Sequence, residues 1–188
     1  PSALSTLPAT VRARFGKRLA GGDAAIYVGI IIECRMTRLG RLLARLARLI
    51  GCSVGSQWVR VSAVRRIRQT HLPICHVDLY VLPEFAGVAE WMGRRAQPVY
   101  EMIEREFGHR VADVKVEIRA GQVPEALASL LEVPGGSPSL QVIRRYHGEN
   151  RKVFEVSVSE HPAERYTYSI QLRRGWQSGN EGGGSWTT

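Results

Sequence analysis

Residues 46–61 read LARLIGCSVGSQWVRV, and residues 127–142 read LASLLEVPGGSPSLQV, a second copy of the same pattern 81 positions later with six identities in sixteen. In each copy a helical apolar pattern ends, a Gly-Ser pair predicts a turn, a strand begins, and a pair of arginines follows. These pairs are Gly55-Ser56 and Arg65-Arg66 in the first copy, and Gly136-Ser137 and Arg144-Arg145 in the second. Because two copies are too few for a solenoid array, we interpret the chain as one domain built by internal duplication. Such a unit can place two charge-bearing hairpins around one small-molecule site.

Length and cysteine content limit the class of protein. A chain of 188 residues folds as about one domain and buries roughly two thirds of its unfolded surface without disulfides or metal ions. The three cysteines are odd in number and show no CxxC spacing, which argues against a disulfide framework or a structural zinc site. No apolar run reaches the roughly 20 residues of a membrane span, and the N-terminus lacks the pattern of a secretory signal. We therefore expect a soluble cytoplasmic protein with no metal ion and no cofactor.

The chain carries a formal net charge of +9 and has a pI near 10.1. Basic surfaces bind phosphate groups, so direct contact with nucleic acid is one alternative function. The arginines are spread over every segment, however, and no recognition-helix or RNA-stacking motif accompanies them. The alternating charges of Lys115, Glu117 and Arg119 are typical of a solvated face of a sheet. Only the charge therefore supports a nucleic-acid binder.

The two ends of the chain differ from its middle. Residues 1–26 mix proline, glycine and arginine without a sustained period, which predicts an arm or a linker remnant. Residues 175–188, GWQSGNEGGGSWTT, are rich in glycine and serine and predict a disordered tail. We expect one folded domain over residues 27–174.

Within this domain, the spacing of apolar residues predicts an order of helices and strands. Thr37 is a candidate N-cap for a helix over residues 38–50, and Gly51 ends that helix. Residues 57–68 and 73–82 alternate as the two strands of a hairpin. The remaining expected elements are helices at 98–107 and 124–131 and strands at 111–120, 138–147, 152–160 and 165–173. The order, roughly β-α-ββ-α-β-α-βββ, indicates an α+β fold with a mainly antiparallel sheet and helices on one face.

Alternate residues along a strand point to opposite faces of a sheet. One set, which includes Val59, Val61 and Val156, is apolar, and we expect it to form the helix-covered core. The other set combines guanidinium groups, carboxylates and short hydroxyls, which suit an anionic or polyhydroxylated metabolite held by bidentate hydrogen bonds. Its members include Arg66, Arg68, Asp78, Tyr80, Glu155, Ser157, Ser159 and Arg165.

Five blocks of sequence carry a resemblance to a known family. They are GCSVGSQWVRVSAVRR, LPICHVDLYVLPEF, PVYEMIEREFGHRV, GSPSLQVIRRY and VFEVSVSEHPAERYTYSIQL. In this order they resemble the UTRA domain, the effector-binding domain of GntR-type bacterial transcription regulators of the HutC subfamily. The resemblance runs from Leu46 to Leu172. It implies a chorismate-lyase-like fold, a homodimer, and a site where a small metabolite alters the operator affinity of an attached winged-helix domain.

The resemblance also implies roles for individual residues. The family's Arg-x-Arg before the hairpin turn, which typically grips a phosphate or carboxylate, matches Arg66 and Arg68. Its acidic residue on the next strand matches Asp78, although the turn is about one residue shorter here and Val77 competes for that position. The remaining matches are Tyr100 at the start of the middle helix, Glu155 and Ser157 on the late strand, His161, and the pair Arg165 and Tyr166 that begins the last strand.

The chain departs from the family pattern in two places. Pro98 stands where the family often has a small hydroxyl residue. Residues 1–37 have neither the length nor the recognition helix of a winged-helix domain, so we expect the sensor half of a regulator, with operator DNA contacted only through a domain missing here. A chorismate-lyase-like enzyme acting on a carboxylated substrate is the alternative, although the sequence order shows no Ser-His-Asp or Cys-His arrangement. Two arginines favour an anionic effector.

Overall fold

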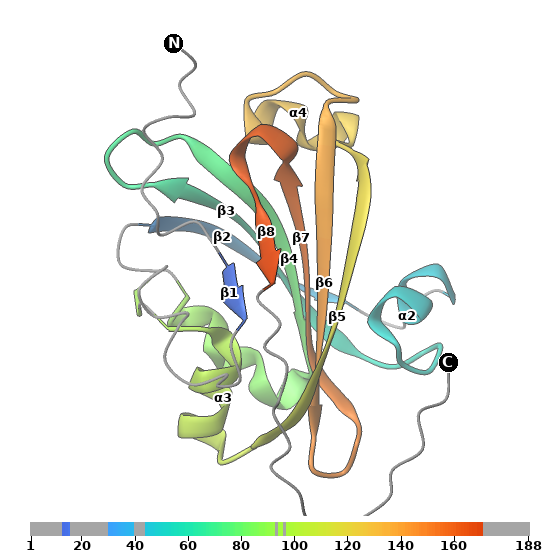
Figure 1. The fold of residues 1–188 in the computed structure, drawn as a ribbon. Coiled ribbons are helices and arrows are strands. Elements are labelled where there is room, and N and C mark those ends of the chain that lie inside the picture. The colour runs from blue at the N-terminus through green and yellow to red at the C-terminus, as the bar shows by residue number, and fades with distance from the viewer. Residues whose placement is uncertain (1–12, 16–29, 40–43, 93, 96, 171–188) are drawn as a thin grey trace, which may run out of the picture.

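The computed structural model describes residues 13–15, 30–39, 44–92, 94–95 and 97–170 (Figure 1). Its elements in chain order are β1 (Ala13–Phe15), β2 (Ile30–Leu39), α2 (Ala44–Ile50), β3 (Trp58–Ile67), β4 (Pro73–Val81), the 3-10 helix η3 (Pro83–Glu90), α3 (Val99–Phe107), β5 (Val111–Gln122), α4 (Glu125–Leu131), β6 (Pro138–Gly148), β7 (Val153–Pro162), the 3-10 helix η4 (Ala163–Arg165) and β8 (Tyr168–Ile170). No helix in these ranges is long and apolar enough to cross a membrane. From β2 onward, the order of strands and α-helices is the one that the sequence predicts.

Six strands form one antiparallel sheet in the order β2-β3-β4-β7-β6-β5. This order mirrors the duplication, because β2, α2, β3 and β4 form one copy and β5, α4, β6 and β7 form the other. The copies meet where β4 pairs with β7. An approximate two-fold axis therefore passes between β4 and β7, perpendicular to the sheet, and the predicted α+β fold with internal duplication is confirmed.

The two copies have the same backbone conformation where each helix gives way to its strand. Gly51 and Glu132 end α2 and α4 with positive φ angles of 82° and 53°. Gly55 and Gly136, in the turns that follow, have φ angles of 83° and 80°. Glycine adopts this conformation without the steric penalty of a Cβ atom, which explains why it recurs in both turns. In each turn a serine hydroxyl donates to a carbonyl three residues earlier, at 2.7 Å.

Apolar side chains pack on both faces of the sheet. On one face, hereafter the α3 face, η3 and α3 cover a cluster that includes Val61 and Phe154. On the other, the α2 face, Ile50 of α2 packs against Trp58 and Ile143. Figure 1 shows α2 and α3 on opposite sides of the sheet. The prediction of helices on one face therefore holds for α3 but not for α2, because Trp58 and Ile143 create a second apolar patch.

The second arginine of each repeated pair ties the two copies together. Arg145 donates from Nε and Nη2 to the carbonyl of Leu49 near the end of α2, at 3.1 and 2.6 Å, and from Nη1 to Glu117 at 2.6 Å. Arg66 donates from Nη1 to Glu132, the residue that ends α4, at 2.7 Å. Each copy thus reaches the helix end of the other copy, where a cation interacts favourably with the helix dipole.

The structure corrects the expected start of the first helix. Thr37 lies inside β2, opposite Arg60 of β3, and is therefore not an N-cap. The helix of the described residues begins at Ala44, and residues 40–43 lie outside them. Pairing with a neighbouring strand outweighs a local capping signal here, because the ladder supplies the hydrogen bonds that a cap would supply.

The chain ends are described in part. Ala13–Phe15, within the predicted arm, forms β1 and pairs in parallel with β8. The predicted last strand, 165–173, begins later than expected, because η4 occupies Ala163–Arg165 and β8 starts at Tyr168. The predicted tail at 175–188 lies outside the described residues. The domain limits 27–174 stay a prediction.

Candidate functional site

A cluster of buried polar residues lies on the α3 face at the centre of the sheet. β7 contributes Glu155, Ser157, Ser159 and His161 at alternate positions, and all four are at most 8% exposed. Ser157 lies opposite Leu79, a member of the apolar cluster beneath α3. Four polar side chains in a row on a covered strand depart from the apolar pattern expected of a core. This row forms the base of the site.

Stacked rings lie at both ends of the row. Tyr146 of β6 pairs with Glu155 across the strands and stacks on Tyr100 of α3, with ring centroids 5.1 Å apart. At the other end, His161 stacks on Tyr166 with centroids 3.9 Å apart and planes inclined by 26°. Aromatic surfaces of this kind exclude water from the polar groups between them and strengthen their electrostatic interactions.

The first arginine of each repeated pair supplies positive charge to the row. Arg65 of β3 lies opposite Cys75, and Arg144 of β6 lies opposite Ser157. Both side chains are partly buried. Burial has the larger effect on both His161 and Cys75: it lowers the pKa of His161 and raises that of Cys75. Both guanidinium groups lower both pKa values, so they add to the effect of burial at His161 and oppose it at Cys75. One arginine from each copy therefore converges on the same cluster.

Glu155 is the most perturbed carboxyl group of this cluster. Burial raises its pKa to about 8, and the positive charge of Arg65 offsets only part of that rise. The carboxyl group is therefore mostly protonated and uncharged at neutral pH. Its Oε2 atom is buried and has no hydrogen-bond partner. An unsatisfied buried polar atom costs about 1–3 kcal/mol, so a ligand group that hydrogen-bonds to it would be favoured.

The other titratable groups of the cluster are also uncharged at neutral pH. Burial, assisted by both arginines, lowers the pKa of His161 to about 3. Burial raises the pKa values of Cys75 and Tyr166, and a hydrogen bond from Arg144 opposes the rise at Tyr166. The cluster thus combines two cations with neutral donors and acceptors, an arrangement that stabilises an anion. Among the described residues, no three His, Cys, Asp or Glu side chains are placed to hold a metal ion.

Asp78 and Tyr80 lie on the α2 face, away from this cluster. Asp78 accepts hydrogen bonds from Arg60 Nε and Nη2 at 2.9 and 2.8 Å and from the Ser62 hydroxyl at 2.5 Å. Burial raises the pKa of Tyr80 to about 12. The prediction that these residues share a face with the polar row of β7 is wrong, because Asp78 pairs with Val158. β4 and β7 are far apart in the sequence, so no tight turn fixes their relative register.

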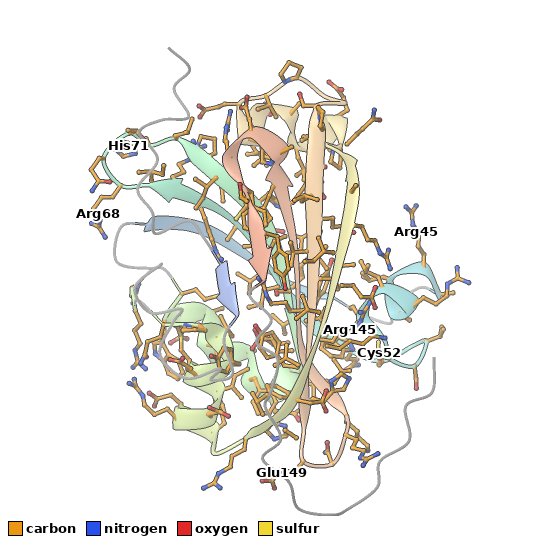
Figure 2. The ribbon with its side chains drawn as sticks, in the orientation of Figure 1. Arg45, Cys52, Arg68, His71, Arg145 and Glu149 are labelled. Carbon is orange, nitrogen blue, oxygen red and sulfur yellow. The ribbon has the colours of Figure 1, made fainter. Side chains whose placement is uncertain are left out.

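Three arginines expected at the site lie elsewhere. Arg66 donates to the carbonyl of His71 at 3.0 Å and to the end of α4. Arg68 is exposed, and Figure 2 shows it with His71 at the tip of the β3–β4 hairpin. Arg165 is buried and donates to the carbonyl of Leu131 at 2.6 Å, among other backbone oxygens. The contacts of Arg66 and Arg165 hold the hairpin, α4 and η4 together, and none of these contacts brings the arginines to Glu155.

The structure brings half of the predicted residues together and adds two more. Those that gather at the cluster are Tyr100, Glu155, Ser157, His161 and Tyr166, and their role in binding a ligand stays a prediction. Arg65 and Arg144 were not predicted as site residues. The available signal was the arginine pair that recurs in both copies. Only one arginine of each pair faces the site, and the sequence does not show which one, because this depends on the register between neighbouring strands.

Comparison with known proteins agrees with this fold. The family model of the UTRA domain matches residues 34–167. A curated relative, the HTH-type transcriptional regulator Rv0792c of Mycobacterium tuberculosis (strain ATCC 25618 / H37Rv), is 34% identical over 113 residues. That match covers 58% of this chain and 42% of the relative, so the chain spans less than half of that regulator.

Solved structures give the same result. The ligand-binding domain of a GntR-family transcriptional regulator from Bordetella bronchiseptica is 27% identical, with a TM-score of 0.63 over 76% of this chain and 89% of that domain. The effector domain of PhnF from Mycobacterium smegmatis is 16% identical, with a TM-score of 0.69 over 87% of this chain and 100% of that domain, and it shows the fold alone. The chain therefore belongs to the UTRA domain family, the effector-binding domains of GntR-type transcription regulators.

Proposed function

We propose that this domain senses an anionic small molecule, which binds with its anionic group between Arg65 and Arg144. The observation that carries the proposal is that one arginine from each copy converges on a cluster whose other titratable groups are uncharged. Guanidinium groups bind carboxylates and phosphates through paired hydrogen bonds, more strongly where water is excluded. The hydroxyls of Ser157 and Ser159 add further hydrogen bonds to the same face.

In this proposal, Glu155 recognises a second group of the effector. Its carboxyl group is protonated at neutral pH, so it donates one hydrogen bond and accepts others. A hydroxyl group on the effector fits both roles and satisfies the buried Oε2 atom. The preferred effector therefore carries a carboxylate or a phosphate at one end and a hydroxyl group towards Glu155.

The output of the sensor is proposed to be operator affinity. The curated relative is an HTH-type regulator, and this chain matches less than half of it. We assign DNA contact to an attached winged-helix domain, and we expect two copies of the sensor to form a homodimer. Effector binding favours one arrangement of the dimer over another, by the difference in its affinity for the two. Direct DNA binding by the sensor is not needed in this scheme.

Binding is proposed to end without turnover of the effector. The related proteins are transcription regulators. His161, the histidine of the cluster, has a pKa of about 3 and is therefore a weak base at neutral pH. A chorismate-lyase-like enzyme would release a changed product, whereas a sensor releases the compound that it bound. Chromatography of the compound recovered after long incubation separates these outcomes.

A thermal-shift screen of the purified chain tests the proposal. Carboxylated and phosphorylated metabolites, with and without a hydroxyl group, are compared with their neutral amides or alcohols. A ligand present at one hundred times its dissociation constant adds about 2.7 kcal/mol of stability, which corresponds to a rise of roughly 5–10 °C in Tm for a domain of this size. We expect a saturable shift from anionic compounds only. A shift from the neutral analogues alone would contradict the role of the arginines.

A further inference from the structure

The edge strand β5 carries a charge pattern that is complementary to itself. β5 is twelve residues long and pairs with β6 on one side. On its other side no strand of the described ranges is present. Figure 1 shows it, in yellow, along one margin of the sheet with β6 on its inner side. A long edge strand presents a row of backbone donors and acceptors that another strand can pair with.

The charged residues of β5 remain accessible in the monomer. Asp113, Lys115 and Arg119 have side chains that are 63%, 65% and 56% exposed. Glu117 is 28% exposed and accepts a hydrogen bond from the buried Arg145. All four lie on the α2 face, because they alternate with Val114, Val116 and Ile118 of the α3 face.

We propose that β5 is the interface with a second copy of this chain, paired antiparallel with itself and centred on Val116. In that register Asp113 faces Arg119 of the other copy, and Lys115 faces Glu117 of the other copy. By symmetry each pair occurs twice, so every charge on the strand meets an opposite charge. Opposite charges across a strand pair stabilise it, and like charges destabilise it. The inference gives the proposed homodimer its interface and is independent of effector binding.

The neighbouring registers are worse. Directly opposite residues share a face, so the centre of an antiparallel self-pairing must fall on a residue. Centring on Glu117 places Lys115 opposite Arg119 and Glu117 opposite itself. Centring on Lys115 places Asp113 opposite Glu117 and Lys115 opposite itself. The register centred on Val116 is therefore favoured by charge, and it joins two sheets into one continuous sheet of twelve strands, six from each copy.

Charge reversal tests this pairing by analytical ultracentrifugation over a range of concentrations. Within one chain Asp113 and Arg119 are six residues apart, about 20 Å along the strand, and do not touch. We expect R119E alone and D113K alone to raise the dimer dissociation constant on the order of tenfold, since each turns two attractive pairs into repulsive ones. The double variant D113K/R119E and an equimolar mixture of the two single variants should both restore dimers.

A cysteine placed at the two-fold axis provides a second test. In the proposed register V116C faces its own copy at a Cα separation of about 4.5–5.5 Å, which suits a disulfide. V114C faces Ile118 instead and serves as the matched control. We expect oxidation to cross-link V116C and to leave V114C at the level of the wild-type chain. Equal cross-linking of both, or dimers unaffected by the charge reversals, would overturn the proposed interface. The effector site is tested separately, by measuring how D113K/R119E binds the compound that stabilises the wild-type chain most in the screen.

Discussion

Arg65 and Arg66 are neighbours in the sequence, but their side chains lie on opposite faces of the sheet and make different contacts. Arg144 and Arg145 repeat this arrangement. Side chains alternate along a strand, so two adjacent arginines cannot both enter the same site. The first member of each pair charges the polar cluster on the α3 face. The second reaches the helix end of the other copy. Each pair thus supplies one residue to the polar cluster, which is the proposed binding site, and one residue to the contact that joins the copies.

At the same scale, Glu155 should make stability depend on pH. Its pKa is about 8 in the folded protein against an ordinary value of 4.5, so the folded state holds one more proton than the unfolded state between these values. The stabilisation is complete below about pH 4.5 and is lost as pH rises through about 8. The free energy of unfolding therefore falls by at most about 1.4 kcal/mol per pH unit in this range. Urea unfolding of the unliganded chain between pH 5.5 and 8.5 measures it.

The control for this prediction is E155Q, which keeps a neutral polar group at the same place. His161 has a lowered pKa and acts in the opposite direction, because its contribution is lost as pH falls below its ordinary value of 6.5. The difference between the wild type and E155Q removes this background. That difference should decline with rising pH. A difference that stays flat up to pH 8.5 would show that Glu155 is already ionised in the folded state.

At the scale of elements, the crossed arginines predict where the fold is sensitive. Arg145 is 7% exposed, and its loss leaves the carbonyl of Leu49 and the carboxylate of Glu117 without their closest donor. We expect R145M to lower the free energy of unfolding by about 2–3 kcal/mol. The exposed pair of Arg105 and Glu106 is the matched control, since an ion pair at the surface contributes little and R105A should leave stability nearly unchanged. Chemical denaturation compares the two, and equal losses would refute the crossed contact.

The elements also show what the sequence could and could not predict. The hairpin of β3 and β4, the helices α3 and α4, and the strands β5 to β7 follow from periodicity and from prolines and glycines, which act locally. The repeated Gly-Ser turns indicated the duplication. The faces of β3 and β4 were also consistent with each other, because a short turn joins them. Local pattern could not place β7 against β4, and a shift of one residue moved Asp78 and Tyr80 away from Glu155.

Local signals also failed where distant partners decide the structure. Thr37 has the residue type of an N-cap, yet it lies in β2 and pairs with Arg60 of β3. Arg66 has the position of the family's binding arginine, yet it donates a hydrogen bond to Glu132 of the other copy. Arg165 likewise binds backbone carbonyls beneath α4. In each case a contact across the sheet outweighed a pattern that was correct locally.

At the scale of the whole molecule, the duplication explains why arginines from both copies meet at the same polar cluster, the proposed binding site. The approximate two-fold axis runs between β4 and β7, and equivalent strands β3 and β6 flank this centre on either side. Arginines at related places on those flanking strands therefore point at the same central region. The edge strands β2 and β5 lie farthest from the axis, so in our proposals β5 pairs with a second copy and the centre of the sheet binds the effector.

The most direct test of this account is titration calorimetry with the compound that stabilises the chain most in the screen. Wild type, R65M and R144M are compared with R60M, which removes an arginine from the opposite face of β3. We predict that R65M and R144M each raise Kd by roughly tenfold to a hundredfold, because each removes a charged hydrogen bond to the effector. R60M should leave Kd unchanged. Loss of binding in R60M, with R65M and R144M unaffected, would place the site on the α2 face and contradict the account.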